Sequence, residues 1–205
     1  MHSYRPYDDL AIRLSRKTAS ECPEGERTPA SVALVLQQNG SGMELFFIER
    51  ARHPKDPWSG NIGFPGGRWD PADADLRQTA ERETMEEVGI DLSAARYLGR
   101  LSDIVGHNLP VRVSCFVYGL LQPVQPVLSH EVHDAFWYGF DELTASKRQV
   151  SSKVNFDGRQ LDAPAIDLGL PDKPVLWGIT YRLVSQFRQV IESGEELVIP
   201  YELPL

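Results

Sequence analysis

The sequence predicts a mixed α/β sandwich, and three observations support this prediction. Apolar runs of strand length, such as VALVLQ and LFFI, recur along the chain and are interspersed with segments of helical periodicity. Residues 173–193 carry apolar side chains at helical spacing, which predicts an amphipathic closing helix. No internal repeat or linker divides the 205 residues. We therefore expect an N-terminal helix and connector over residues 1–30 and a single domain over residues 31–205.

The first half of the chain predicts a hairpin followed by a long loop. Residues 10–19 favour a short helix, and the polar stretch 20–31 favours a connector. The apolar runs 31–38 and 43–50 flank a glycine-rich turn, which is typical of a β-hairpin. Residues 51–74 are dense in Pro and Gly and contain several aromatic side chains. A loop of this length is usually functional or disordered, and the aromatic residues favour order.

The second half predicts one prominent helix and several short elements. Asp73 or Asp75 is a candidate N-cap for a helix that runs to Val88, and Gly89 is the expected stop. Strands that alternate with helices are what a mixed sandwich requires. The remaining expected elements are strands over 96–105, 111–121 and 133–140, a short helix over 141–146 capped by Asp141, and a hairpin over 153–166 that turns at Asp157-Gly158.

Composition and charge exclude several classes of protein. The apolar fraction of 41% and the charged fraction of 24% are ordinary for a globular chain. The apolar runs are too short to cross a bilayer, the N-terminus lacks the apolar core of a signal peptide, and two cysteines give no disulfide framework. A net charge of −8 argues against nucleic acid as a partner. We expect a cytoplasmic protein without membrane contact, in which a divalent cation attracts any anionic substrate.

The expected helix before Gly89 carries an unusual number of carboxylates. Glu83, Glu86 and Glu87 share an arc of roughly 100° on one helix face, whereas Glu81 points away. Like charges at this spacing, and carboxylates at a helix C-terminus, each cost a few tenths to about 1 kcal/mol. A bound Mg²⁺ or Mn²⁺ would turn this repulsion into attraction, because both ions prefer oxygen ligands. The alternative is a solvated acidic face on an acidic protein.

Upstream of this helix, a Gly-Gly pair that ends in Gly67 lets the backbone approach an ion or a phosphate closely. Together with the segment Arg82–Ile90, this glycine resembles the Nudix box, G-x5-E-x7-R-E-U-x-E-E-x-G-U, in which U is aliphatic. The sequence departs from the box at Thr84, which stands at an aliphatic position, and in having fourteen rather than thirteen residues between Gly67 and Arg82. The isolated glutamate of the box has no exact counterpart in residues 73–75. The resemblance implies a Nudix-type α/β/α sandwich with a mixed central sheet.

The chain is also similar to the coenzyme A pyrophosphatase-like branch of the Nudix family. It shares with that branch Arg50-Ala51, the F-P-G-G sequence at 64–67 and a W-G-x-T sequence at 177–180. Lys55 stands where the branch has an arginine, and the distance to Gly60 is longer by one residue. The similarity implies that a small-molecule nucleotide related to coenzyme A is the substrate.

The resemblance further implies a metal site. Glu83, Glu86 and Glu87 are the expected ligands of Mg²⁺ or Mn²⁺. A backbone carbonyl near Gly66 or Gly67 is expected to help them, with the same two glycines close to the substrate. Oxygen donors of this kind suit both ions.

Four residues have other expected roles, three of which follow from the same resemblance. Arg82 is expected to orient the box carboxylates through charge-assisted hydrogen bonds. The general base is either a glutamate of the box or Glu131, which precedes the predicted strand over 133–140. Arg50, which stands at a position of the branch motif, is a candidate clamp for substrate phosphates. Arg52 is a second candidate because it belongs to the basic cluster over residues 50–55, and ordinary surface charge is the alternative for it.

The implied reaction is hydrolysis of the diphosphate bond of coenzyme A or its derivatives, which gives 4′-phosphopantetheine and adenosine 3′,5′-bisphosphate. One alternative keeps this chemistry on another nucleoside diphosphate derivative, such as a nucleoside triphosphate, ADP-ribose or a sugar nucleotide. Another alternative is a Nudix module that binds nucleotides without hydrolysis, although the complete set of metal ligands argues against it. Nudix relatives are often dimers, so the sequence leaves a homodimer open.

Overall fold

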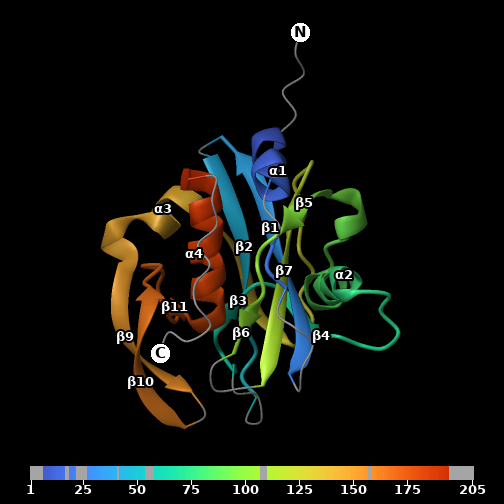
Figure 1. Cartoon of the computed structure of the whole chain (residues 1–205). Helices are drawn as coiled ribbons and strands as arrows, with labels where there is room; N and C mark the ends of the chain where they lie inside the picture. The colour runs from blue at the N-terminus through green and yellow to red at the C-terminus, as the bar shows by residue number, and fades with distance from the viewer. Residues whose placement is uncertain are drawn as a thin grey trace.

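The computed structural model of the chain describes residues 7–16, 19–21, 27–40, 42–53, 58–106, 110–156 and 158–193 (Figure 1). Lys55 and Asp157, which the sequence analysis singled out, lie outside these residues. The helices are α1 (Asp8–Ser15), α2 (Leu76–Val88), α3 (Phe140–Thr144) and α4 (Gly178–Ser193), with 3₁₀ helices η1 (Leu92–Ala94) and η2 (Ser146–Arg148). The strands are β1 (Thr28–Asn39), β2 (Gly42–Arg50), β3 (Ile62–Gly63), β4 (Gly66–Arg68), β5 (Arg96–Arg100), β6 (Ile104–Val105), β7 (Val111–Gly119), β8 (Val132–Gly139), β9 (Gln149–Phe156), β10 (Arg159–Ile166) and β11 (Leu176–Trp177).

The central sheet has eight strands and is mixed. Its main path runs β3-β2-β1-β7-β5, with β8 beside β2, β4 beside β1 and β6 beside β7. β1 lies parallel to β7, and the other pairings described in this sheet are antiparallel. Asn39 pairs with Gly42, which confirms the hairpin that the glycine-rich turn predicts.

Helices cover both faces of the central sheet (Figure 1). Side chains alternate along β1, so that Leu34 and Leu36 join the apolar cluster beneath α1 and α4. Ala33 and Val35 join the second cluster, which α2 covers. This layering confirms the predicted α/β/α sandwich, and it places the acidic helix on the face opposite α4.

A second sheet, of order β11-β10-β9, stands beside the sandwich (Figure 1). Phe156 lies opposite Arg159, so the predicted hairpin between β9 and β10 is confirmed. Ile166 of β10 pairs with Leu176 of β11, and both side chains are buried in the cluster beneath α4. The second sheet is therefore attached to the face of the sandwich that α4 covers.

Several element boundaries differ from the sequence predictions. Helix α1 starts and ends earlier than predicted, at Asp8 and Ser15. The closing helix begins only at Gly178, whose φ is 64°, because the two preceding residues pair with β10 as strand β11. Gly139 rather than Asp141 is the N-cap of α3. The predicted long loop contains two short strands, β3 and β4, which pair with β2 and β1.

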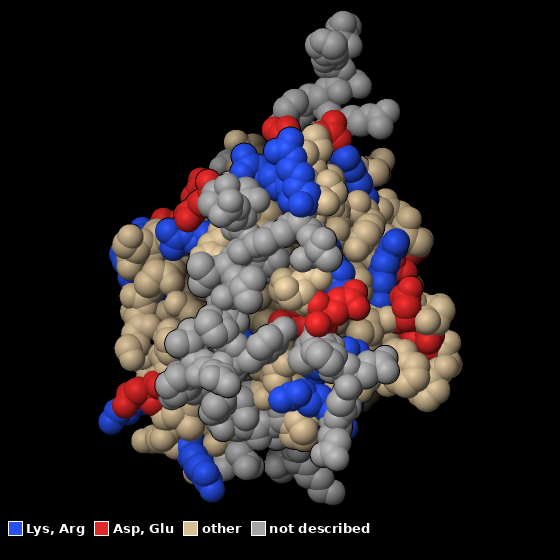
Figure 2. Space-filling view, in the orientation of Figure 1, with Lys and Arg blue, Asp and Glu red and all other residues tan. Residues whose placement is uncertain are grey.

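Two surface observations concern possible partners. No helix among the described residues is long and apolar enough to cross a membrane. Figure 2 shows Lys and Arg side chains in small groups, interspersed with Asp and Glu, on the face that it draws.

Candidate functional site

Helix α2 carries the acidic face, and both of its ends are fixed. At the N-terminus the Asp75 carboxylate accepts a 2.8 Å hydrogen bond from the Gln78 N–H. At the C-terminus Gly89 adopts a φ of 67°, a conformation that favours glycine, and its N–H donates to the Met85 carbonyl at 3.0 Å. The predicted end of the helix is confirmed, so the last helical turn presents its carboxylates immediately before a sharp change of chain direction.

Strand β4 brings the Gly66–Gly67 pair against α2, and neither glycine has room for a side chain. A Cβ on Gly66 would lie 2.2 Å from the Ser31 carbonyl oxygen, because β4 pairs closely with β1. A Cβ on Gly67 would lie 2.4 Å from Cδ of Glu83. The missing side chain of Gly67 therefore lets the Glu83 carboxylate lie directly against the β4 backbone.

Glu87 is the buried member of the acidic face, with only 3% of its surface exposed. Its Oε2 accepts a 2.9 Å hydrogen bond from the Gly66 N–H, and its Oε1 lies 3.5 Å from Nη1 of Arg50. Burial raises the pKa of Glu87 to about 7. The Gly66 N–H and the charge of Arg50 oppose this increase, whereas the charges of Glu83 and Glu131 add to it. A carboxylate in this environment is stabilised by any cation that approaches it.

Arg82 lies at the centre of a carboxylate network. Its Nε and Nη2 donate to the two carboxylate oxygens of Asp73 at 2.9 and 3.0 Å. Its Nη1 donates to Glu83 and to Glu86, at 2.9 Å in each case. Ionic hydrogen bonds of this kind are short and directional. Arg82 therefore sets the orientation of two carboxylates of the acidic face, with Asp73 as its anchor.

Asp73 belongs to the site, although the sequence analysis considered it only as a possible helix N-cap, a position that Asp75 occupies. Its side chain is buried and also accepts a 2.9 Å hydrogen bond from the Thr79 hydroxyl. The hydrogen bonds from Arg82 hold the pKa of Asp73 below its usual range, so that it stays ionised. Five residues separate Gly67 from Asp73, which is the spacing of the isolated glutamate in the Nudix box. Counting from Gly67 would have found it, because the additional residue lies between Asp73 and Arg82.

Glu131 immediately precedes β8, and its side chain is exposed. Its loop is attached on two sides, because the Ser129 N–H donates to the Glu87 carbonyl and the Glu131 carbonyl accepts from the Ala51 N–H, both at 2.8 Å. The negative charge of Glu131 raises the pKa of both Glu83 and Glu87. Glu131 is therefore within electrostatic reach of the acidic face, on a loop that is hydrogen-bonded to the C-terminal turn of α2.

The two candidate phosphate clamps lie in different places. Arg50 ends β2, and its guanidinium forms the ion pair with Glu87. Arg52 is exposed, and its Cγ would lie 3.7 Å from a Cβ on Gly60. The structure thus brings Arg50 into the acidic site and places Arg52 along the loop that leads to β3.

The donor set of the acidic face fits a divalent cation in its chemistry. Among the described residues, no three Asp, Glu, His or Cys side chains are already arranged to hold a metal ion. Glu83 and Glu86 are instead held by Arg82. Burial raises the pKa of Glu83 and of Glu87, and repulsion from neighbouring carboxylates adds to the increase. A bound cation would relieve this repulsion, and carboxylate oxygens are the donors that Mg²⁺ and Mn²⁺ prefer.

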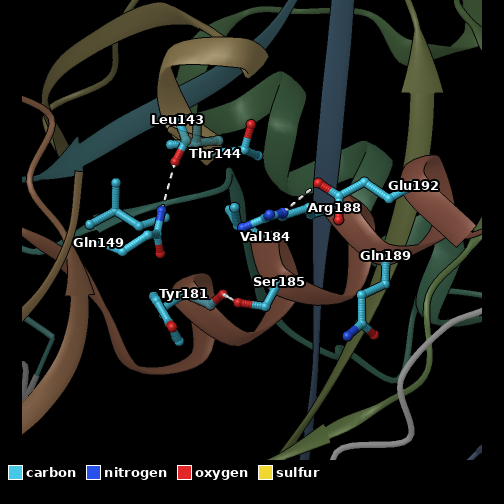
Figure 3. A pocket seen from close by; sticks show the side chains of 10 residues that line it. Leu143, Thr144, Gln149, Tyr181, Val184, Ser185, Arg188, Gln189 and Glu192 are labelled. Atoms are coloured by element: carbon cyan, nitrogen blue, oxygen red, sulfur yellow. Dashed lines mark hydrogen bonds and ion pairs between the residues drawn. The ribbon is translucent and has the colours of Figure 1, made fainter. Parts of the chain in front are cut away.

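Two cavities lie outside this acidic face. A cavity of about 660 Å³ adjoins the first turn of α2, with Trp69, Arg77 and Phe116 among its walls. The other, of about 290 Å³, lies between α3 and α4, with Tyr181 and Arg188 among its walls (Figure 3). Neither cavity is lined by the carboxylates of the acidic face. The acidic face therefore belongs to the junction of α2, β4 and the end of β2, apart from both cavities.

Comparison with known protein families identifies this arrangement. The family model of the NUDIX domain matches residues 26–157, which contain the whole acidic face, Gly67 and Glu131. The chain belongs to the Nudix family. The segment from Gly67 to Ile90, which resembles the Nudix box, lies within the matched residues, and the spacing of Asp73 from Gly67 is that of the isolated glutamate of the box.

Curated relatives share moderate similarity with this Nudix chain. A probable Nudix hydrolase of Schizosaccharomyces pombe is 26% identical over 172 residues, which cover 83% of this chain and 59% of that protein. An uncharacterised protein of the same yeast is 35% identical over 121 residues, which cover 54% of this chain and 36% of that protein. The chain thus spans less than two thirds of the length of either yeast relative. The uncharacterised Nudix hydrolase NudL of Yersinia pestis is 28% identical over 153 residues, 72% of each chain.

Solved structures of Nudix proteins share the fold. A MutT/Nudix family protein of Enterococcus faecalis aligns with a TM-score of 0.55 and 13% identity, over 92% of this chain and 75% of that one. The MutT protein of Methanosarcina mazei Go1 aligns with a TM-score of 0.52 and 19% identity, over 84% of this chain and 100% of that one. At these identities the likeness establishes the Nudix sandwich and nothing about the substrate.

Proposed function

We propose that this Nudix protein hydrolyses the diphosphate bond of a nucleoside diphosphate derivative with the help of Mg²⁺ or Mn²⁺. The observation that carries the proposal is the environment of Glu87, a buried carboxylate whose charge is disfavoured. It shares its helix face with Glu83 and Glu86 and is held by Gly66 and Arg50. Such a cluster opposes folding, and strongly perturbed carboxylates of this kind gather at functional sites.

The residues of the acidic face have two roles in metal binding, as ligands and as groups that orient the ligands. Glu83, Glu86 and Glu87 supply the oxygen ligands, and Arg82 keeps Glu83 and Glu86 oriented through its hydrogen bonds. When bound, the cation supplies a Lewis acid that neutralises phosphate oxygens and acidifies water. The ion pair between Arg82 and Asp73 fixes the direction from which Arg82 reaches both carboxylates.

Two further residues act on the substrate and on water. Arg50 exchanges part of its contact with Glu87 for a phosphate oxygen of the diphosphate, since a guanidinium binds phosphate well. Glu131 accepts a proton from the attacking water. The water oxygen forms a bond to one phosphorus, the bridging P–O bond breaks, and the other phosphate leaves with the electron pair.

Within this chemistry we propose coenzyme A as the substrate. The support is the similarity of three segments, which begin at Arg50, at Phe64 and at Trp177, to the coenzyme A pyrophosphatase-like branch. Two arginines near the end of β2, Arg50 and Arg52, also suit a substrate that carries a 3′-phosphate in addition to its diphosphate. Other nucleoside diphosphate derivatives would bind to the same residues. They are therefore the competing substrates with which coenzyme A is compared.

A substrate panel tests both parts of the proposal. Coenzyme A, ADP-ribose, a nucleoside triphosphate and a sugar nucleotide are incubated with the protein and Mg²⁺ or Mn²⁺, and the products are identified by mass spectrometry. We expect 4′-phosphopantetheine and adenosine 3′,5′-bisphosphate from coenzyme A. Faster hydrolysis of ADP-ribose would refute the substrate, and no hydrolysis at all would favour a nucleotide-binding module.

A pair of matched variants links the activity to the acidic face. Glu87→Gln removes the charge of the buried ligand. Glu81→Gln makes the same change on the same helix, where Glu81 accepts hydrogen bonds from the Tyr118 hydroxyl and Arg77 instead. We expect E87Q to lose activity by orders of magnitude and E81Q to keep it. Equal activities of the two variants would contradict the assignment of the site.

A further inference from the structure

The segment that leads into α4 takes no part in the proposed chemistry, although it lies against β3, which pairs with the strand that ends in Arg50. Trp177, at the end of β11, donates from Nε1 to Oδ1 of Asn61 at 3.1 Å. Thr180, in the first turn of α4, has its Oγ1 3.7 Å from where a Cβ on Gly63 would lie. Two residues of the W-G-x-T sequence therefore lie against the chain around β3, the short strand that pairs with β2.

Asn61 links this segment to Arg50 through its backbone. The Asn61 carbonyl accepts a 3.0 Å hydrogen bond from the Arg50 N–H. On the other side of β2, the pairing with β8 changes register between Glu49 and Arg50. A bulge of this kind bends a strand and redirects the side chain beside it. The contact with Asn61 therefore holds the backbone from which the Arg50 side chain projects, next to the bulge.

Lys173 provides a second connection between the segment before α4 and the end of β2. Its Nζ lies 2.7 Å from Oε2 of Glu49, and the two side chains are only 14% and 9% exposed. Lys173 also binds Asp134 of β8. Because both side chains are largely buried, solvent screens the Lys173–Glu49 ion pair only weakly, and the pair links the Lys173 segment to β2. The segment from Lys173 to Trp177 thus holds β2 at Glu49 directly and at Arg50 through Asn61.

We propose that the sheet β9–β11 braces Arg50 for the diphosphate of the substrate, with Trp177 and Asn61 as positioning residues. The contacts form a continuous path. The Phe156 ring meets Trp177 edge-on at 6.0 Å, Trp177 binds Asn61, Asn61 binds the Arg50 backbone, and the Arg50 side chain reaches Glu87 at 3.5 Å. The inference rests on the proposed function, because Arg50 is the residue proposed to bind phosphate.

Single hydrogen bonds along this path can be removed by substitution, and at Asn61 this is possible with little change in side-chain volume. Trp177→Phe keeps an aromatic ring but lacks the N–H donor, and Asn61→Leu lacks the acceptor that Asn61→Asp retains. We expect W177F and N61L to lower kcat/KM about five- to tenfold, which corresponds to the loss of one hydrogen bond. N61D should retain most of the wild-type value. If W177F does not fold, the comparison of N61L with N61D carries the test.

Two comparisons separate positioning from general stability. In an Arg50→Ala background, W177F should cause no further loss, because the path ends at Arg50. Tyr138→Phe is the matched control, since the buried Tyr138 hydroxyl donates at 2.6 Å to the Leu168 carbonyl and also joins the main sheet to the chain after β10. Y138F should lose stability and keep kcat/KM. Two results would refute the proposal that the second sheet positions Arg50. One is that the losses of R50A and W177F add in the double variant, and the other is that Y138F loses as much activity as W177F.

Amide hydrogen exchange gives a measurement that does not depend on activity. In the ligand-free protein, the Arg50 N–H should exchange about five- to tenfold faster in W177F than in the wild type, and at the wild-type rate in Y138F. Unchanged exchange in W177F would refute the brace whatever the activity. If the wild type hydrolyses no diphosphate, the proposed function fails, while the exchange rate still decides whether the sheet holds Arg50.

Discussion

Replacing Glu87 with glutamine should stabilise the metal-free protein at neutral and alkaline pH. The Glu87 side chain is 3% exposed, and burial raises its pKa from 4.5 to about 7. At about 1.36 kcal/mol for each pH unit, this difference makes ionisation about 3 kcal/mol less favourable in the folded protein than in the unfolded chain. Glutamine has the same shape and still accepts from the Gly66 N–H, but it carries no charge to bury.

The sign of the pH dependence follows from proton binding. Between pH 4.5 and about 7, the folded protein holds a proton on Glu87 that the unfolded chain has released. The contribution of Glu87 to the free energy of unfolding therefore falls as the pH rises through this window, and it is constant at higher pH. Wild type and E87Q should have similar stabilities below the window. Above it, the variant should be more stable by about 2–3 kcal/mol.

Urea unfolding in the presence of a chelator, repeated across this pH range, measures the difference. Glu81→Gln is the control and should keep the pH slope of the wild type. Adding Mg²⁺ should stabilise the wild type more than E87Q, because ligand binding to the folded state raises its stability and the variant binds the cation more weakly. Parallel pH profiles for wild type and E87Q, or an E87Q protein that is less stable than the wild type above pH 7, would refute the account of a disfavoured charge.

Three other substitutions have defined outcomes. Gly67→Ala places a methyl group 2.4 Å from Cδ of Glu83. We expect this variant to lower kcat about ten- to a hundredfold while its circular dichroism spectrum stays unchanged. Wild-type kinetics would show that Glu83 need not lie against β4. Asp73→Asn weakens the ion pair that holds Arg82 and should lower kcat/KM about tenfold. Asp73→Glu should recover part of this loss. Steady-state kinetics that do not distinguish Asp73→Asn from wild type would contradict the role of Asp73 in orienting Arg82. Glu131→Gln should lower kcat without changing Mn²⁺ affinity measured by calorimetry, and an unchanged kcat would assign the general base to a glutamate of the box.

Local elements were readable from the sequence because local interactions decide them. Gly89 ends α2 as predicted, and Asp75, one of the two predicted caps, begins it, so residue types alone give the helix to within two residues. The helical spacing of Glu83, Glu86 and Glu87 likewise predicts a shared face once the helix is accepted. The apolar runs around the glycine-rich turn predict the β1–β2 hairpin for the same reason.

Contacts between distant segments were not readable in this way. Residues 176–177 read as part of the closing helix, because the strand that they form depends on pairing with β10, which no local pattern reveals. The ion pair of Arg50 with Glu87 arises only when β2 and α2 pack on the same sheet. Asp73 could be predicted only in part. Its spacing from Gly67 can be counted in the sequence, but its two hydrogen bonds from Arg82 are seen only in the folded structure.

The central claim is that the acidic face of α2 holds a divalent cation beside a diphosphate, and calorimetric titration of Mn²⁺ tests it most directly. The titration is performed on wild type, E87Q and E81Q in the presence of ADP. We predict that Mn²⁺ binds wild type and E81Q with equal affinity and binds E87Q at least about tenfold more weakly. No binding of Mn²⁺ to the wild type, or the same affinity in all three proteins, would contradict the account.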